Sequence, residues 1–97
     1  MTNSLPSSIN LKVISLRKLL VDEEVQEISL PSLEGYIGIL PGHRPLILAL
    51  GEGDITYRLA GKEEHLSVRG GFAEVLPEKV LVFTESIEDE TQQPAEG

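Results

Sequence analysis

The sequence contains no cysteine and no tryptophan, and its aromatic residues are two tyrosines and two phenylalanines. Without cysteine the chain has no disulfide, no thiolate metal site and no catalytic thiol, which is typical of proteins from a reducing compartment. Eight basic residues stand against sixteen acidic ones, for a net charge of −8. Such a composition offers nucleic acid neither a stacking platform nor a positive surface, so we expect no nucleic-acid partner.

Long apolar segments are missing as well. No run approaches the ~20 apolar residues that a membrane-spanning helix needs. Residues 1–10 lack the basic start and the apolar stretch of a signal peptide. We therefore expect a cytoplasmic chain that does not insert into a membrane.

Catalytic and cofactor-binding motifs are also absent. Neither His43 nor His65 has neighbours at metal-ligand spacing, and no glycine cluster follows a phosphate-binding pattern. No Ser-His-Asp arrangement or nucleophile elbow is found. The sequence thus predicts a protein that is not an enzyme and holds no metal or cofactor. A hydrolase that uses Glu34 and His43 is the least supported alternative.

Charge and composition divide the chain into three parts. The acids from residue 85 onward have no basic residue among them, and residues 1–8 are rich in Ser, Asn and Pro. Polar segments of this kind bury too little apolar surface to fold. We predict a disordered leader at 1–8, one folded domain at 9–86 and a disordered acidic tail at 87–97.

Within the folded part, apolar and polar residues alternate with a period of two, which predicts β-strands. Segment 16–28 is a candidate helix, but its apolar residues would fall on opposite faces of that helix. We expect two strands there instead, with a turn at residues 22–24; a short helical turn is the alternative. Several short strands separated by Gly and Pro turns predict an all-β sandwich or barrel. The expected core residues include Val68, Phe72, Val75, Val80 and Val82.

Two glycine-containing pairs predict special backbone geometry. Pro41-Gly42 suits the centre of a type II turn, because proline fixes φ and glycine takes a positive φ. His43 and Arg44 follow the tip of this turn and are accessible to a partner, although the simplest expectation for His43 is a local hydrogen bond. Gly70-Gly71 predicts a β-bulge or a close approach between backbones.

Two blocks of the sequence, EGYIGILPGHRPL (34–46) and VRGGFAEV (68–75), resemble the epsilon subunit of F-type ATP synthases in their order and spacing. The resemblance implies a flattened β-sandwich of about ten short strands. It also implies a non-catalytic rotor subunit of the central stalk, which links the gamma subunit to the membrane rotor ring in ion-gradient-driven ATP synthesis. The implied location is the cytoplasmic face of the bacterial inner membrane.

The same resemblance implies two contact regions. Residues that match the gamma-facing region are Ser15, His43, Arg44, Pro45 and Leu46. Residues that match the ring-facing edge are Glu34, Gly35, Tyr36 and Gly38. Tyr36 stands where the family often has an acidic residue, so a carboxylate contact to the ring is either missing or moved to Glu34.

The sequence departs from typical family members at its end, where a C-terminal pair of helices usually follows. The final residues show no helical periodicity. We expect either a short form or a part of a longer protein, which neither inhibits by inserting helices nor binds nucleotide. The alternative function is a free-standing β-sandwich module that binds a peptide or a sugar.

Overall fold

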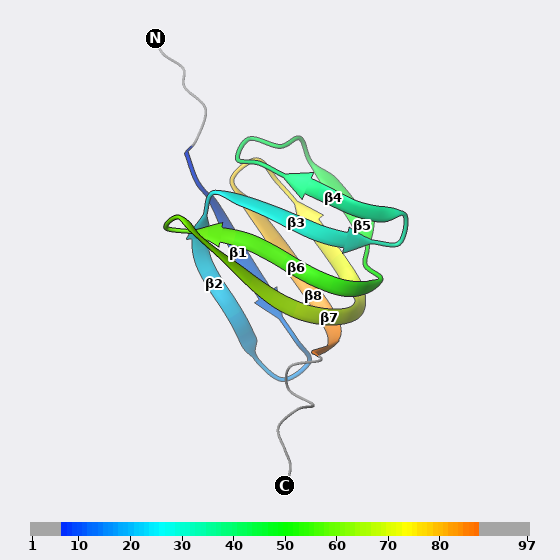
Figure 1. Cartoon of the computed structure of the whole chain (residues 1–97). Coiled ribbons are helices and arrows are strands. Elements are labelled where there is room, and N and C mark those ends of the chain that lie inside the picture. Colours follow the sequence, from blue (N-terminus) through cyan, green and yellow to red (C-terminus); the bar gives the residue numbers. More distant parts are fainter. Residues whose placement is uncertain (1–6, 88–97) are drawn as a thin grey trace, which may run out of the picture.

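The computed structural model describes residues 7–87, and every regular element in this range is a β-strand (Figure 1). The strands are β1 (Ile9–Ile14), β2 (Leu19–Val25), β3 (Glu27–Ser32), β4 (Gly35–Ile39), β5 (Leu46–Ala49), β6 (Glu52–Leu59), β7 (Lys62–Val75) and β8 (Lys79–Ile87). The all-β prediction is confirmed. The predicted leader and acidic tail lie mostly in residues 1–6 and 88–97, outside the described residues, and stay predictions.

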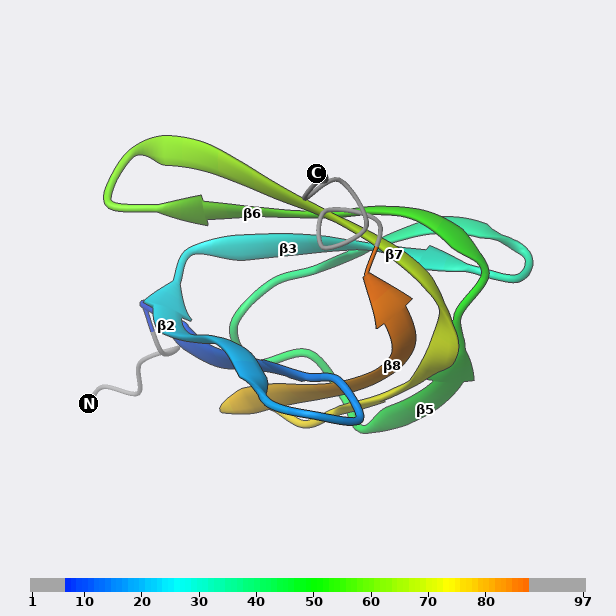
Figure 2. The same ribbon diagram turned by 90° about the horizontal axis from the view of Figure 1, so that it is seen from below.

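The strands form one sheet in the order β2-β1-β8-β7-β6-β3-β4, with β5 paired to β7. This sheet folds over into two layers that face each other, as Figure 2 shows. The first, here called the β3–β6 layer, contains β4, β3, β6 and residues 62–69 of β7. The second, the β1–β8 layer, contains β2, β1, most of β8, β5 and residues 72–75 of β7. Within the described residues there are eight strands where about ten were expected, and β7 passes unbroken from one layer into the other.

Gly70 and Gly71 make the corner at which β7 changes layers. Both have positive φ, +72° and +111°. The Leu50 amide donates to the Gly71 carbonyl at 2.9 Å, and the Gly70 amide donates to the Gly51 carbonyl at 3.0 Å. A Cβ on Gly71 would overlap the carbonyl oxygen of Phe83. The predicted close backbone approach is therefore confirmed, and no residue with a side chain fits at Gly71.

Side chains that point between the layers form a purely apolar core, apart from Thr84. The buried set is Ile9, Leu11, Val13, Val25, Ile28, Leu30, Ile39, Leu50, Ile55, Val68, Ala73, Val75, Val80 and Val82. Four of the five expected core residues are in it. The placement of Phe72 in the core was wrong: Ala73 and Val75 point inward, so the strand period of two turns Phe72 outward, where 49% of it is exposed.

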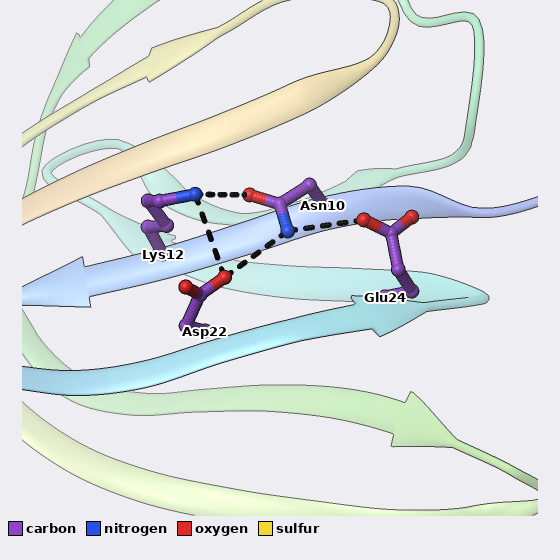
Figure 3. Close-up of polar contacts among 4 residues, drawn as sticks. All are labelled: Asn10, Lys12, Asp22 and Glu24. Carbon is purple, nitrogen blue, oxygen red and sulfur yellow. Dashed lines mark hydrogen bonds and ion pairs between the residues drawn. The ribbon is translucent and has the colours of Figure 1, made fainter.

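Residues 16–28 contain no helix, as predicted, but the expected turn at residues 22–24 was wrong. β2 runs straight through these acids, and the chain turns at Gln26 instead. Pairing with β1 explains the difference. Asp22 lies 3.4 Å from the Lys12 ammonium. The side-chain amide of Asn10 donates to the carboxylates of Asp22 and Glu24, at 3.2 and 3.1 Å (Figure 3). Cross-strand partners of this kind stabilise a charged strand.

The Pro41-Gly42 pair forms the predicted type II turn. Gly42 has a φ of +88°, and the His43 amide donates to the Leu40 carbonyl at 3.1 Å, which closes the turn. The Gly42 amide donates to the Pro77 carbonyl at 2.8 Å. The turn is thereby tied to the connection between β7 and β8, and its position relative to the β1–β8 layer is fixed.

Candidate interaction surface

An apolar row crosses the outer face of the β1–β8 layer. The strand registers place its members opposite one another: Leu19 with Ile14, Ile14 with Phe83, Phe83 with Phe72, and Phe72 with Ala49. These five residues, from five neighbouring strands, are called the apolar row below. Leu19 and Phe72 are each about half exposed, at 50% and 49%. The row is therefore an accessible apolar surface and does not belong to the core.

The centre of the row is an aromatic pair, and the apolar surface extends beyond it. The rings of Phe72 and Phe83 have centroids 5.1 Å apart and are tilted by 32°. In the neighbouring cross-strand row, Leu81 and Ile47 flank Glu74 on the same face, and 71% of Ile47 is exposed. Contiguous exposed apolar surface of this kind marks interaction sites in soluble proteins.

Sequence reasoning missed this row, although a signal for it was present. Ile14 extends the alternation of Ile9, Leu11 and Val13 by one residue in the opposite phase. Phe72 likewise precedes the inward Ala73 out of phase. Two apolar residues in the outward phase of separate strands were the available signal, but only the pairing of β1 with β8 and β7 shows that they are neighbours.

The outer face of the β3–β6 layer is polar. Arg58 pairs with Glu27 across the β6–β3 ladder at 4.0 Å, and the Ser67 hydroxyl donates to Asp54 at 2.7 Å. His65 lies 3.5 Å from Glu63, and Arg69 lies 3.4 Å from Glu52. Arg58 and Arg69 thus each have an acidic partner within this face. The two outer faces of the sandwich differ in chemistry, and the apolar one is suited to a protein partner.

The predicted gamma-side residues occupy two separate places. Ser15 is in the β1–β2 turn beside the apolar row, where its hydroxyl accepts hydrogen bonds from the amides of Arg17 and Lys18 at 3.2 and 3.3 Å. Residues 43–46 lie at the other end of the layer, since Gly42 is tied to the β7–β8 connection and that connection contacts the start of β1. The structure does not bring these two groups together.

Within residues 43–46 the side chains differ in accessibility. Arg44 and Pro45 are exposed, whereas Leu46 packs against the core. The Nδ1 atom of His43 donates to the Arg44 carbonyl at 2.7 Å. The local hydrogen bond expected for His43 is therefore confirmed.

The predicted ring-side residues lie together on the β3–β4 hairpin. The Ser32 hydroxyl donates to the Gly35 carbonyl at 2.5 Å and accepts from the Glu34 amide at 3.2 Å. This ordered turn exposes the Glu34 side chain at its tip. Gly35, with a φ of +124°, begins β4, and Tyr36 follows it on the outer face. Gly38 lies opposite Ser29 with open space where a Cβ would be.

A groove of about 370 Å³ separates the β3–β4 turn from β5. Its lining is mostly apolar and includes Leu33, Ile37 and residues 46–49; Glu34 supplies the charge at its rim. Because of this lining, the groove provides a hydrophobic contact surface between the predicted gamma-side and ring-side residues. Residues 7–87 contain no group of three or more His, Asp or Glu side chains able to hold a metal ion.

Tyr57 of β6 is partly buried and packs against the core. Burial raises the pKa of its hydroxyl above the usual value of 10.0, and the carboxylates of Glu64 and Glu23 raise the pKa further. These three side chains come from β6, β7 and β2, so the pKa of Tyr57 depends on the approach of the two layers.

Comparison with known proteins decides the family. Residues 8–90 match the model of the ATP synthase delta/epsilon chain, beta-sandwich domain. The chain belongs to the ATP synthase delta/epsilon chain family. The ATP synthase epsilon chain of Solibacter usitatus is 43% identical over 84 residues, which are 87% of this chain and 63% of the relative. The epsilon chain of Desulforapulum autotrophicum is 44% identical over 86 residues, 88% of this chain and 64% of the relative.

Chains from two solved ATP synthase assemblies have a similar structure. A chain of the Euglena gracilis mitochondrial ATP synthase, determined by cryo-EM with OSCP, F1 and c-ring, superposes with a TM-score of 0.80 at 27% identity, covering 88% of this chain and 55% of the other. A chain of the Tetrahymena thermophila central stalk and c-ring shares the fold, with a TM-score of 0.70 at 12% identity, covering 97% and 78%.

This delta/epsilon family member spans less than two thirds of the length of the curated epsilon chains that it matches. The matched part is the β-sandwich domain. Among the described residues, no helix has the length and hydropathy needed to cross a membrane.

Proposed function

We propose that the chain is a non-catalytic rotor subunit in the central stalk of an F-type ATP synthase, where it links the gamma subunit to the membrane rotor ring. The observation that carries the proposal is the apolar row on a sandwich of the delta/epsilon family. Its relatives are ATP synthase epsilon chains, and a structural neighbour comes from an assembly that contains a c-ring. The subunit acts peripherally, at the cytoplasmic face of the bacterial inner membrane.

The gamma subunit is the proposed occupant of the apolar face. Half-exposed Phe72, paired with the Phe83 ring, provides the kind of aromatic anchor that dominates protein interfaces. Ser15 borders this row, and Arg44 and Pro45 extend the contact at the far end of the layer. The polar outer face of the β3–β6 layer, with its Arg58–Glu27 and Arg69–Glu52 pairs, stays in solvent.

The rotor ring contacts the β3–β4 turn in this proposal. Glu34 is the acidic residue at the tip of that turn, and Gly35 and Gly38 flank it without obstructing side chains. A carboxylate at this tip is suited to basic or polar groups on the loops of the ring. The ring therefore binds the hairpin edge, while gamma binds the apolar face.

The architecture suits the mechanical part of this role. β7 passes through both layers without a break, so the two faces are covalently continuous. The core between them is close-packed, as protein interiors are, and resists deformation. Torque applied at the ring-side hairpin is therefore carried to the gamma-side face by a body that resists bending.

A binding measurement with purified gamma subunit tests the proposal. The wild-type chain is expected to bind at micromolar concentration, and Phe72→Asp is expected to weaken binding at least tenfold, which corresponds to about 1.4 kcal/mol. Thr56→Asp adds the same charge to the polar face and should leave binding unchanged. A chain that fails to bind gamma or the ring, but gives hits on a peptide or glycan array, would support the free-standing binding module instead.

A further inference from the structure

The geometry of the β3–β4 hairpin assigns a positioning role to Tyr36. We infer that its hydroxyl anchors the hairpin to β6 and thereby holds Glu34 in the orientation in which it contacts the rotor ring. The inference rests on the proposed function, because it concerns how the ring-side contact is presented. Tyr36 thereby joins the ring-side residues as one that reaches across a strand and acts on the rotor-ring contact through Glu34.

Tyr36 spans three strands. It belongs to β4 and lies opposite Pro31 of β3. Its hydroxyl accepts a hydrogen bond from the backbone amide of Asp54, on β6, at 3.1 Å. The side chain therefore crosses β3 on the outer face and ends on the next strand. Although 62% of Tyr36 is exposed, its polar tip is held in place.

The Asp54 amide needs this acceptor because the β3–β6 ladder stops before it. That ladder pairs Glu27–Ser29 with Thr56–Arg58. Continuing the same register would set Pro31 opposite Asp54. Proline has no N–H, and the Pro31 carbonyl accepts instead from the Gly51 amide at 2.8 Å. The Tyr36 hydroxyl thus replaces a ladder contact at the point where β3 leaves β6.

Gly53 provides the space for the tyrosine ring. A Cβ at this position would collide with the Tyr36 hydroxyl, and it would lie 2.9 Å from the Pro31 Cβ and 3.2 Å from the Tyr36 Cζ. Gly53 is not among the glycines with positive φ, so its backbone does not require glycine. The glycine is explained by the aromatic side chain that lies over it.

The anchor acts on Glu34 through the backbone, because only Gly35 separates Tyr36 from Glu34. Ser32 orders the turn on its β3 side by bonding to Glu34 and Gly35. Tyr36 orders it on the β4 side, directly after Gly35. With both sides held, the exposed Glu34 carboxylate has a defined position relative to the body of the sandwich. Pre-ordering of this kind lowers the entropy lost when a contact forms.

A double-mutant cycle tests the inference. The 97-residue chain and its variants are titrated against a detergent-solubilised complex of rotor ring and gamma subunit from the same organism. Tyr36→Phe is expected to weaken binding about threefold, within the range of one hydrogen bond. Glu34→Gln should weaken binding as well, and the double variant should bind like Glu34→Gln alone. Tyr57→Phe, which removes the other tyrosine hydroxyl, is the matched control and should change nothing.

A second measurement follows the hydrogen bond between Tyr36 and Asp54 itself. Amide hydrogen exchange at Asp54 should become faster in Tyr36→Phe. Gly53→Ala, which displaces the aromatic ring of Tyr36, should speed exchange at Asp54 in the same way and should likewise abolish the coupling to Glu34.

The outcomes separate the two proposals. Effects of Tyr36→Phe and Glu34→Gln that multiply, or wild-type binding by Tyr36→Phe, would overturn the positioning role while leaving the rotor function intact. Failure of the wild-type chain to bind the ring–gamma complex would overturn the rotor function, and the positioning role with it.

Discussion

Phe72 lies directly opposite Phe83 in the β7–β8 ladder, with ring centroids 5.1 Å apart, on the outer face of the sandwich. The largest apolar side chain of the GGF block thus contributes to the surface, while its small neighbour Ala73 points into the core. This arrangement separates stability from binding: truncating the aromatic ring should affect a partner more than the fold.

Phe72→Ala is expected to lower the free energy of unfolding by about 1–2 kcal/mol, because the ring is only half buried and loses one aromatic contact. Leu30→Ala, at a fully buried position, should cost about 2–5 kcal/mol and serves as the core control. Urea unfolding monitored by circular dichroism measures both. Equal losses would show that Phe72 belongs to the core after all.

Gly71→Ala is expected to prevent folding or to cost several kcal/mol. The added Cβ would overlap the Phe83 carbonyl, and the φ of +111° is strained for any L side chain. Gly38→Ala is the matched control, since nothing lies within 4 Å of its Cβ position. Thermal unfolding of the two variants should differ sharply. A Gly71→Ala chain as stable as Gly38→Ala would rule out the tight corner.

Gly42→Ala should destabilise the chain by about 1–2 kcal/mol, which is the usual cost of forcing a residue with a Cβ into the left-handed region. Gly42 has a φ of +88°, and its amide would keep its bond to Pro77. The midpoint of urea unfolding reports the change. An unchanged midpoint would argue against the type II turn at Pro41-Gly42.

Stability should fall above about pH 10 because of Tyr57. Burial, then Glu64 and Glu23, raise the pKa of Tyr57 in the folded chain above its usual value of 10.0. The unfolded chain therefore loses the tyrosine proton first, and its ionisation favours unfolding as the pH rises. Below the usual pKa both states keep the proton and the contribution is constant.

Unfolding of the wild-type chain and of Tyr57→Phe between about pH 8 and about pH 11 isolates this term. The stability of the wild-type chain relative to that of Tyr57→Phe should fall toward the alkaline end. Tyr36→Phe is a control for general effects of alkali. A wild-type curve parallel to that of Tyr57→Phe would show that Tyr57 titrates normally.

The backbone geometry at Pro41-Gly42 and at Gly70-Gly71 was predictable, because it depends on local chemistry. A proline followed by glycine favours one turn type whatever surrounds it, and the pair at residues 70–71 permits a backbone conformation that other residues resist. The same locality made the alternation at residues 9–13 and 55–59 readable as strand, and both segments lie within β1 and β6.

The turn expected at residues 22–24 failed for the opposite reason. Three consecutive acids favour a loop when considered alone, and only the ladder with β1 supplies the Lys12 and Asn10 partners that hold Asp22 and Glu24 in a strand. The side on which Phe72 lies could likewise be settled only by the inward direction of its neighbours.

The sequence by itself determined an all-β chain, most of its expected core residues and the sharp turns at its glycines, because alternation and turn chemistry act over a few residues. The family followed from the resemblance of two sequence blocks. Tertiary structure alone decided that Leu19, Ile14, Phe83, Phe72 and Ala49 form one row, and that Tyr36 reaches Asp54 across a strand. Both depend on which strands become neighbours, and strand pairing is a long-range outcome of burying one common core.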